Sequence, residues 1–145
     1  MKIMRVEKTS AQWIALAEYM ENAWEYGGHL AGCMKRGALK DWEAVFAALD
    51  DQRFVGFCSL LEEDYYPENR YSPWISSVFV EKSHRGHFLS RQLVAAAEDY
   101  ARELGFKAAY IPTDGTGFYE RMGYEKIDEL VNYGGDTDNV YRKLL

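Results

Sequence analysis

A basic segment that contains glycine lies between a run of apolar residues and an amphipathic helical pattern. Residues Ser83–Arg91 read SHRGHFLSR. Free backbone N–H groups at a helix N-terminus bind anions, because the helix dipole adds positive potential there. Gly86 would let the backbone approach a ligand closely, and Arg85 and Arg91 would add charge. The segment therefore predicts an anion site, although a surface turn with exposed arginines explains it about equally well.

A second segment places a tyrosine among turn-forming residues. Residues Thr113–Tyr124 read TDGTGFYERMGY and follow a short apolar run. A phenol can donate a proton, but a tyrosine with apolar neighbours belongs to the core more often than to a catalytic site. Taken alone, Tyr119 is therefore a weak catalytic candidate.

The spacing of glycine, cysteine and histidine excludes several other chemistries. Neither the Walker pattern G-x-x-x-x-G-K-[ST] nor the dinucleotide pattern G-x-G-x-x-G occurs. Cys33 and Cys58 stand far apart, without a C-x-x-C pair or a Cys/His cluster at metal-ligand spacing. The sequence predicts no metal site, and Cys58 is expected to be a small buried hydrophobe. The histidines His29, His84 and His87 are expected at the surface.

The strands and helices that must position these segments follow from the spacing of apolar residues. Strands are predicted at Lys2–Val6, Trp42–Leu49, Phe54–Leu61, Trp74–Val80, Ala108–Ile111, Tyr124–Val131 and Asn139–Leu144. A first helix is predicted with a Thr9–Gln12 capping pair, an apolar face that reaches Trp24 and an end at Gly27–Gly28. Further helices are predicted at Leu30–Leu39, Leu89–Leu104 and Gly117–Met122.

The strand Trp74–Val80 is expected to be central, because it is apolar on both sides. Simple alternation places Trp74, Val78 and Val80 on one face, and Ile75 and Phe79 on the other. The order of the elements predicts an α/β fold, in which a mixed (α+β) sheet carries helices on both faces. One domain over residues 1–145 is expected from the length.

Charge and composition limit the partners. The 145-residue chain has a net charge of −6 and a pI near 5.1, whereas proteins that bind nucleic acid carry a basic face. No apolar stretch approaches the roughly 18 residues of a membrane span. Charged residues between Lys2 and Lys8 stand where a signal peptide would be apolar. We expect a cytoplasmic protein without membrane contact, and a homodimer is compatible with the sequence.

Together, the two segments resemble the GNAT superfamily of N-acetyltransferases. In that family a central strand leads into a pyrophosphate loop of pattern [R/Q]-x-x-G-x-[G/A], which aligns with Arg85–Ser90. A later family segment, F-Y-E-x-x-G-[F/Y], aligns with Phe118–Tyr124, and Val140–Leu144 resembles the last strand. The resemblance is strongest from Arg53 onward and weak over the N-terminal part.

This resemblance implies an enzyme that uses acetyl-CoA as co-substrate and lets an amine attack the thioester directly. Tyr119 matches the family's general-acid tyrosine, which donates a proton to the departing thiolate. Backbone N–H groups of the central strand would bind the oxyanion. The coenzyme-binding residues implied are Val78, Phe79, Val80, Arg85, Gly86, His87, Phe88, Leu89, Ser90 and Arg91.

Two features depart from the family pattern. Phe88 stands where the loop pattern has Gly, and Ser90 stands where it has Gly or Ala. The donors at those places are backbone N–H groups, so other residues can supply them, but Phe88 predicts either a different loop path or a ring beside the coenzyme. The central strand carries no carboxylate to act as a base. A water relay and four residues remain open alternatives: Glu62, Glu63, Asp64 and Asp114.

Other interpretations follow from the same residues. A non-catalytic acyl-CoA-binding module is favoured by Phe88 and opposed by the complete segment around Tyr119. An interaction protein is a third interpretation, but no contiguous exposed aromatic stripe supports it. For an enzyme, we expect a small and cationic amine acceptor, attracted by carboxylates and stacked on aromatic rings. The residues concerned are Glu18, Glu21, Glu25, Glu62, Glu63, Asp64 and Glu68, with Trp24, Tyr26, Tyr65, Tyr66 and Trp74.

Overall fold

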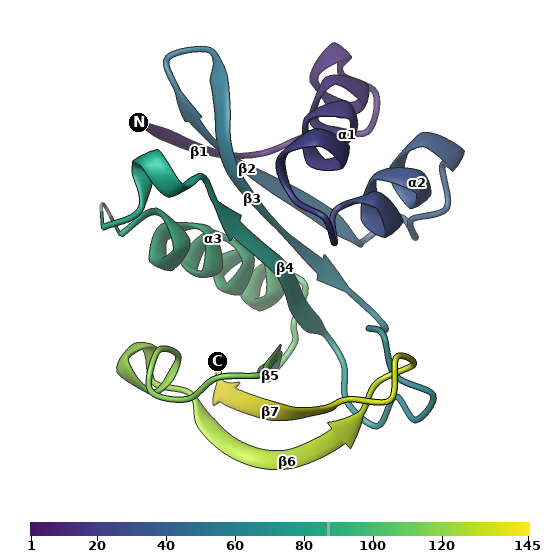
Figure 1. Ribbon diagram of the computed structural model, residues 1–145, viewed down its shortest axis with the longest axis vertical. Coiled ribbons are helices and arrows are strands. Elements are labelled where there is room, and N and C mark those ends of the chain that lie inside the picture. Colours follow the sequence, from purple (N-terminus) through teal and green to yellow (C-terminus); the bar gives the residue numbers. More distant parts are fainter. Residues whose placement is uncertain (87) are drawn as a thin grey trace.

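The computed structural model describes residues 1–86 and 88–145, which form a mixed seven-stranded sheet (Figure 1). The strands lie in the order β1-β2-β3-β4-β5-β7-β6. Neighbouring strands are antiparallel, except that β4 and β5 are parallel. The predicted mixed sheet is confirmed. The strands are β1 (Lys2–Arg5), β2 (Ala44–Asp50), β3 (Arg53–Leu61), β4 (Trp74–Val80), β5 (Ala108–Thr113), β6 (Glu125–Val131) and β7 (Thr137–Leu144).

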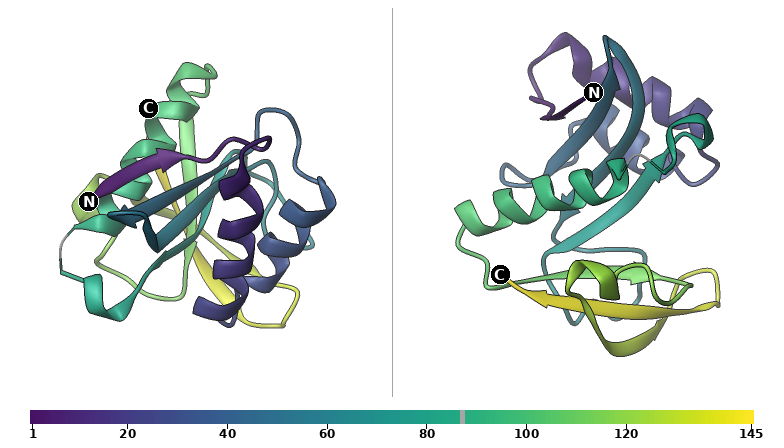
Figure 2. Two further views of the ribbon diagram at one scale, coloured as in Figure 1. Left: turned by 90° about the horizontal axis from the view of Figure 1, so that it is seen from above. Right: turned by 90° about the vertical axis from the view of Figure 1, so that its left-hand side faces the viewer.

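Helices cover both faces of the sheet, as predicted. Figures 1 and 2 show α1 and α2 next to each other on one face and α3 across the other. Short 3-10 turns, η1 and η2, follow β4 and β5. No helix within the described ranges is long and apolar enough to cross a bilayer. The bounds are α1 (Ala11–Ala23), α2 (Gly28–Arg36), α3 (Leu89–Glu103), η1 (Lys82–His84) and η2 (Glu120–Met122).

Side chains of β2 show why the sheet has two apolar faces. Phe46 and Ala48 belong to the buried cluster under α3, whereas Val45 and Ala47 belong to the cluster under α1 and α2. Successive residues of a strand point to opposite faces, so one strand feeds both clusters. The helix predicted over Leu89–Leu104 also packs on the first cluster through its apolar residues, but Leu104 follows the helix end and is 39% exposed.

Several predicted helix boundaries are wrong. The predicted Thr9–Gln12 pair does not cap α1, which begins after Ser10, and the Ser10 hydroxyl donates to the Glu7 carbonyl at 2.8 Å. Gly27 does not end α1 but directly precedes α2. A Cβ atom at Gly27 would lie 2.4 Å from the Met20 carbonyl oxygen, so only glycine fits where the chain turns back on α1.

The predicted helix over residues 117–122 shrinks to η2. Gly117 has a φ of 93°, which is incompatible with a right-handed helix at its start. A preceding glycine, Gly115, donates its N–H to the Thr113 hydroxyl at 3.1 Å. This stretch is therefore a tight turn that leads into the segment of Tyr119.

A bulge interrupts β4. Phe57 pairs with Phe79, and Ser59 pairs with Ser76, so β4 has one more residue than β3 between these pairs. Ser77 takes up the extra length with a φ of 53°, in the left-handed region. Such a bulge bends a strand and leaves one residue unpaired.

The bulge makes the predicted facing of the β4 side chains wrong. Ile75 lies before the bulge and Val78 and Val80 lie after it, yet all three pack under α3. Trp74, predicted to share a face with Val78, lies instead in a third cluster beside β6 and β7. One added residue exchanges the two faces of a strand, and no local pattern in the sequence predicts this residue.

β4 and β5 separate soon after they begin. The parallel pairing in the described residues is at Trp74 and Tyr110, and the Tyr110 N–H donates to the Pro73 carbonyl at 3.1 Å. Beyond this point the two strands diverge (Figure 1). The later part of β4, which contains the bulge, therefore has an edge that β5 does not cover.

Candidate active site

A pocket of about 400 Å³ lies where β4 ends, α3 begins and the segment before η2 passes. The fold thus brings residues from the two candidate segments, Ser83–Arg91 and Thr113–Tyr124, into one pocket. A smaller cavity of about 170 Å³ lies beside Arg5–Thr9 and contains none of the predicted site residues. The predicted residues that line the larger pocket are Val78, Phe79, Val80, Arg85, Gly86, Phe88, Leu89, Ser90 and Tyr119.

Two predicted coenzyme-binding residues are not placed in this lining. Arg91 extends toward η2, where its Nη2 donates to the Arg121 carbonyl at 3.1 Å. His87 lies outside the residues that the structure describes. Sequence reasoning missed two residues that line the pocket, His84 and Phe118, and it named a third, Trp24, only as a ring for the acceptor amine.

The β4 bulge brings backbone groups to the pocket. Ser77 and Val78 both lie opposite Cys58, so the regular ladder between β3 and β4 is interrupted there. Val78, Phe79 and Val80 line the pocket, and β5 has already diverged from this part of β4. The backbone of this stretch is therefore placed to form hydrogen bonds with a ligand.

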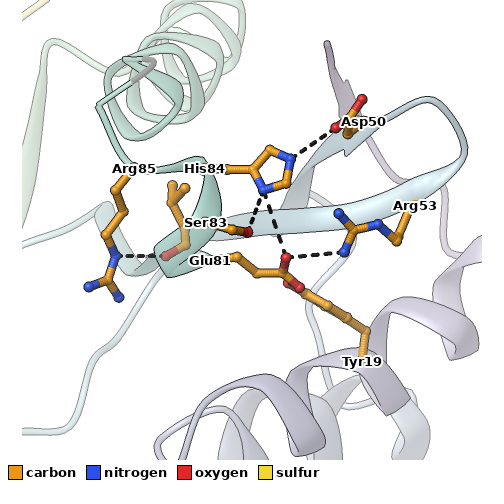
Figure 3. Close-up of polar contacts among 8 residues, drawn as sticks. Tyr19, Asp50, Arg53, Glu81, Ser83, His84 and Arg85 are labelled. Carbon is orange, nitrogen blue, oxygen red and sulfur yellow. Dashed lines mark hydrogen bonds and ion pairs between the residues drawn. The ribbon is translucent and has the colours of Figure 1, made fainter.

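A polar network holds the chain after β4 (Figure 3). Oε1 of Glu81 accepts a hydrogen bond from the Tyr19 hydroxyl of α1 at 2.9 Å. Oε2 of Glu81 pairs with the Arg53 guanidinium of β3 at 3.2 Å. Burial and the bond to Glu81 raise the pKa of Tyr19, which stays a neutral donor. The network therefore ties α1, β3 and the end of β4 together.

His84, expected at the surface, is largely buried in the same network. Its Nε2 lies 2.9 Å from Oδ2 of Asp50, and its Nδ1 lies 2.8 Å from the Ser83 hydroxyl and 3.9 Å from Glu81 (Figure 3). The bond from His84 lowers the pKa of Asp50. Because both ring nitrogens have partners, the imidazole is held in one orientation and fixes the turn before Arg85.

Arg85, Gly86 and Phe88 are described residues of the chain between η1 and α3, and all three line the pocket. Nε of Arg85 donates to the Val80 carbonyl at 3.0 Å, which holds the guanidinium at the pocket (Figure 3). Gly86 has a φ of 87° and open space at its Cβ position. Phe88 directly precedes α3 with a φ of 59°, and its ring is 70% exposed. Phe88 thus takes a left-handed conformation that glycine favours.

Tyr119 forms part of the pocket wall within an aromatic group. The centroid of its ring lies 5.0, 6.0 and 6.5 Å from those of Phe118, Tyr124 and Tyr141. The N–H groups of Met122 and Tyr124 donate to the Tyr119 carbonyl and close the turn of η2. Burial raises the pKa of Tyr119 to about 12, so the hydroxyl stays protonated at neutral pH.

A buried ion pair supports this aromatic group. Glu98 of α3 is 5% exposed, and its two oxygens accept hydrogen bonds from the Tyr124 hydroxyl at 2.6 Å and from Nζ of Lys143 at 3.2 Å. A buried carboxylate is tolerated only with such partners. The triad therefore fixes Tyr124, on which the ring of Tyr119 packs.

The candidate proton acceptors differ in their surroundings. Glu62 pairs with Lys40, and Glu63 and Asp114 are exposed. Asp64 is half-buried with its Oδ2 atom inaccessible to solvent, and burial raises its pKa to about 6. Within residues 1–86 and 88–145, no group of His, Cys, Asp and Glu side chains is arranged to hold a metal ion.

Acidic and aromatic side chains gather at the connection between α1 and α2. Tyr26 is 68% exposed, and its ring contacts Trp24 edge-on with centroids 5.4 Å apart. The pKa of Tyr26 is raised by the neighbouring Glu25 and also by the charges of Asp114 and Asp136. Segments far apart in the sequence thus concentrate negative charge near Trp24, which also lines the pocket.

Solved structures of other proteins share this fold. An aminoglycoside 6'-N-acetyltransferase in complex with coenzyme A is similar with a TM-score of 0.75 and 19% identity, over 99% of this chain and 97% of that chain. A spermidine N-acetyltransferase from Vibrio cholerae is similar with a TM-score of 0.69 and 16% identity, over 99% of this chain and 92% of that chain. At these identities the likeness establishes the fold alone.

Sequence comparison extends the likeness beyond the fold. An acetyltransferase from Agrobacterium fabrum is 38% identical over 60 residues, which make up 39% of this chain and 44% of that protein. The chain thus spans less than half the length of the curated relatives it matches. The model of the Acetyltransferase (GNAT) family matches residues 7–124, which include both motif segments. This match covers most of the chain, and the chain therefore belongs to the GNAT acetyltransferase family.

Proposed function

We propose that this chain transfers an acetyl group from acetyl-CoA to the amine of a small acceptor. One observation carries the proposal: a single pocket collects the β4 bulge, the Arg85–Ser90 loop and Tyr119. These supply backbone donors, an anion site at a helix N-terminus and a phenol that keeps its proton. The anion site would bind the coenzyme, the backbone donors would stabilise the oxyanion, and the phenol would stabilise the leaving thiolate; membership of the GNAT family supports acetyl-CoA as the donor.

The pyrophosphate of acetyl-CoA would bind at Arg85–Ser90. This loop leads into the first turn of α3, where backbone N–H groups have no helical partner. Gly86 gives the phosphates close access to the backbone, and Arg85 supplies positive charge. The contacts of Glu81 and His84 hold the turn in place, so that binding requires little further ordering.

The thioester would lie between the β4 bulge and Tyr119. Attack of the amine nitrogen on the carbonyl carbon moves negative charge to the carbonyl oxygen, which backbone N–H groups of residues 78–80 would stabilise. When the tetrahedral intermediate collapses, the C–S bond breaks and the sulfur keeps the electron pair. The Tyr119 hydroxyl would then donate to this thiolate.

The high pKa of Tyr119 defines its part in this step. A thiol has an ordinary pKa of about 8.5, below the value of about 12 for Tyr119. The phenol therefore stabilises the thiolate mainly as a hydrogen-bond donor. The second proton lost by the nitrogen completes the thiol, and Tyr119 ends the cycle protonated.

We infer that the acceptor is a cationic amine. Glu25, Asp114 and Asp136 surround Tyr26 with negative charge, and the chain as a whole carries a net charge of −6. Ammonium groups are attracted by such a field and stack on aromatic rings. The two structures with this fold described above are named for aminoglycoside and spermidine substrates, which carry several amines.

A panel of amines tests this function. Release of free thiol from acetyl-CoA is measured with spermidine, an aminoglycoside, a neutral arylamine and an anionic amino acid, at low and high salt. We expect the cationic acceptors to give the highest kcat/KM. Their advantage should fall with salt, because the Debye length falls from about 10 Å at 0.1 M to about 3 Å at 1 M. Faster turnover of neutral or anionic acceptors, unaffected by salt, rejects the cationic acceptor.

The role of Tyr119 is tested by Tyr119→Phe. We expect kcat to fall roughly 10²- to 10³-fold with little change in the KM for acetyl-CoA, because the hydroxyl donates a hydrogen bond to the departing sulfur. Tyr100→Phe is the matched control, since Tyr100 lies on α3 beside Arg5 and outside the pocket. Wild-type turnover in Tyr119→Phe would remove Tyr119 from the mechanism.

The second candidate function is a non-catalytic acyl-CoA-binding module. The observation that favours it is Phe88, whose side chain stands in the pocket wall where the family loop has glycine. This alternative predicts calorimetric binding of acetyl-CoA without thiol release for any amine of the panel. Turnover with one of these amines excludes it.

A further inference from the structure

Two buried polar atoms have no hydrogen-bond partner among the residues that the structure describes. They are Oδ2 of Asp64, an acceptor, and Nε1 of Trp74, a donor. Asp64 lies in the loop between β3 and β4, and Trp74 is the first residue of β4. Burial of such atoms without partners is unfavourable, so each is an atom whose hydrogen bonding a ligand or water would complete.

The loop holds the Asp64 carboxylate by one oxygen and leaves the other in the interior. Oδ1 accepts the N–H of Tyr65 at 2.7 Å. The N–H of Asp64 donates to Oδ1 of Asn69 at 2.9 Å, and Nδ2 of Asn69 donates back to the Asp64 carbonyl at 3.1 Å. These contacts fix the backbone and the side-chain direction, so the unpartnered Oδ2 is a feature of the loop's structure.

The carboxylate faces Ser76 of β4. The hydroxyls of Ser76 and Ser59 lie 3.1 Å apart. Cys58 and Leu60 pack under α3, so Ser59 between them points to the face of α1 and α2. The Ser76 hydroxyl is close enough to lower the pKa of Asp64, although it does not meet hydrogen-bond geometry. Asp64 therefore lies on the α1–α2 face, next to the β4 bulge.

Burial dominates the electrostatics of Asp64. It raises the pKa of the carboxyl from 3.8 to about 6, and the charge of Asp138 on β7 adds to the increase. The N–H of Tyr65, the Ser76 hydroxyl and His29 on α2 act in the opposite direction. Asp64 is thus ionised above about pH 6, and it is a stronger base than an exposed aspartate by about two pKa units, or about a hundredfold.

We propose that Asp64 accepts the proton that the acceptor amine must lose before it attacks, a role that rests on the proposed function. The amine arrives as an ammonium ion with a pKa near roughly 10.4. One proton passes to the carboxylate, and the released electron pair forms the C–N bond. The C–S bond then breaks, the second proton of the nitrogen completes the thiol, and Asp64 returns its proton to water. β4 itself carries no carboxylate, so the neighbouring loop supplies one.

Asp64→Asn tests the role directly, because it removes the base and keeps the oxygen that accepts the Tyr65 N–H. Thiol release is measured against pH with spermidine and with an aminoglycoside. Asp99→Asn is the matched control, since Asp99 is an exposed residue of α3 paired with Arg102. We expect Asp64→Asn to lower kcat roughly 10²- to 10⁴-fold and to keep the calorimetric affinity for acetyl-CoA. The wild type should lose activity as the pH falls through about 6, and this acid limb should be absent from the variant.

A stability measurement adds a readout that needs no acceptor. The folded pKa of Asp64, about 6, lies above the ordinary value of 3.8, so its contribution to stability is complete below pH 3.8 and is lost as the pH rises through about 6. Asparagine does not titrate. The variant should therefore gain stability relative to the wild type between pH 4 and pH 7.5, by up to about a hundredfold in the folding equilibrium. Asp99→Asn should show no such gain.

The outcomes separate this proposal from the proposed function. A wild type that transfers no acetyl group to any amine refutes the proposed function, and the role of Asp64 with it. An active wild type whose Asp64→Asn variant has equal turnover and the same acid limb overturns the role of Asp64 alone. If Asp64→Asn has a higher KM for the amine but keeps the wild-type kcat and acid limb, Asp64 binds the amine without accepting its proton. This result also overturns the proposal.

Discussion

Phe88→Gly tests whether the backbone conformation of Phe88 is strained. Phe88 has a φ of 59° and a ψ of 19°, a region that costs a residue with a Cβ atom about 1–2 kcal/mol. Its ring is 70% exposed, so removal of the ring loses little burial. Glycine loses about 0.5–1 kcal/mol more backbone entropy on folding. The balance predicts a variant more stable than the wild type by about 0.5–1 kcal/mol.

Phe88→Ala separates the strain from the ring. Alanine also lacks the ring but keeps the Cβ atom that makes the left-handed conformation unfavourable. We expect Phe88→Gly to unfold about 2–4 °C above Phe88→Ala in thermal denaturation followed by circular dichroism at fixed pH. The calorimetric affinity for acetyl-CoA should change equally in both variants, because both lack the ring. Equal midpoints of unfolding for the two variants would refute the assigned backbone strain.

Three further perturbations follow from the contacts described. Tyr124→Phe should lower the free energy of unfolding by about 1–3 kcal/mol in denaturant titrations, because the buried Glu98 loses its 2.6 Å hydrogen bond. Gly27→Ala should be destabilising by more than about 1 kcal/mol in the same assay, since its Cβ atom would lie 2.4 Å from a carbonyl oxygen. His84→Ala should raise the KM for acetyl-CoA more than it lowers kcat, because the turn loses its bond to Asp50. A lower kcat at unchanged KM would contradict this role of His84.

Most of the fold could be predicted from local patterns in the sequence. The alternation of side chains in β2 and the helical spacing of apolar residues in α3 are each contained within one element. Both patterns can therefore be recognised in a short stretch of sequence. The loop Arg85–Ser90 and the segment of Tyr119 were found for the same reason, since each is one contiguous motif. Helix ends were predicted less well, because the clash that requires glycine at Gly27 comes from the backbone of Met20.

Features that depend on pairing between elements could not be predicted. The bulge at Ser77 arises because β4 has one more residue than β3 between two paired positions. This difference becomes visible only when the two strands are paired. His84 was expected at the surface because its partner Asp50 lies at the end of β2, far away in the sequence. Position next to Arg85 was the one signal for His84, whereas Trp24 was named from the sequence as a ring for the acceptor amine and as part of an apolar helix face. The burial of Asp64 has the same origin, because an acidic run such as residues 62–64 usually indicates a solvated loop.

The early divergence of β4 and β5 bears on how this fold adapts to new substrates. Paired strands are held about 4.8 Å apart by their backbone, whatever their sequence. Past the pair of Trp74 and Tyr110, the strands as described have no such pairing, and the side chains between them set the separation instead. Side chains can be exchanged one at a time without the loss of a strand. Variation at this opening can therefore change the size of the group that fits while the hydrogen bonding of the sheet stays intact.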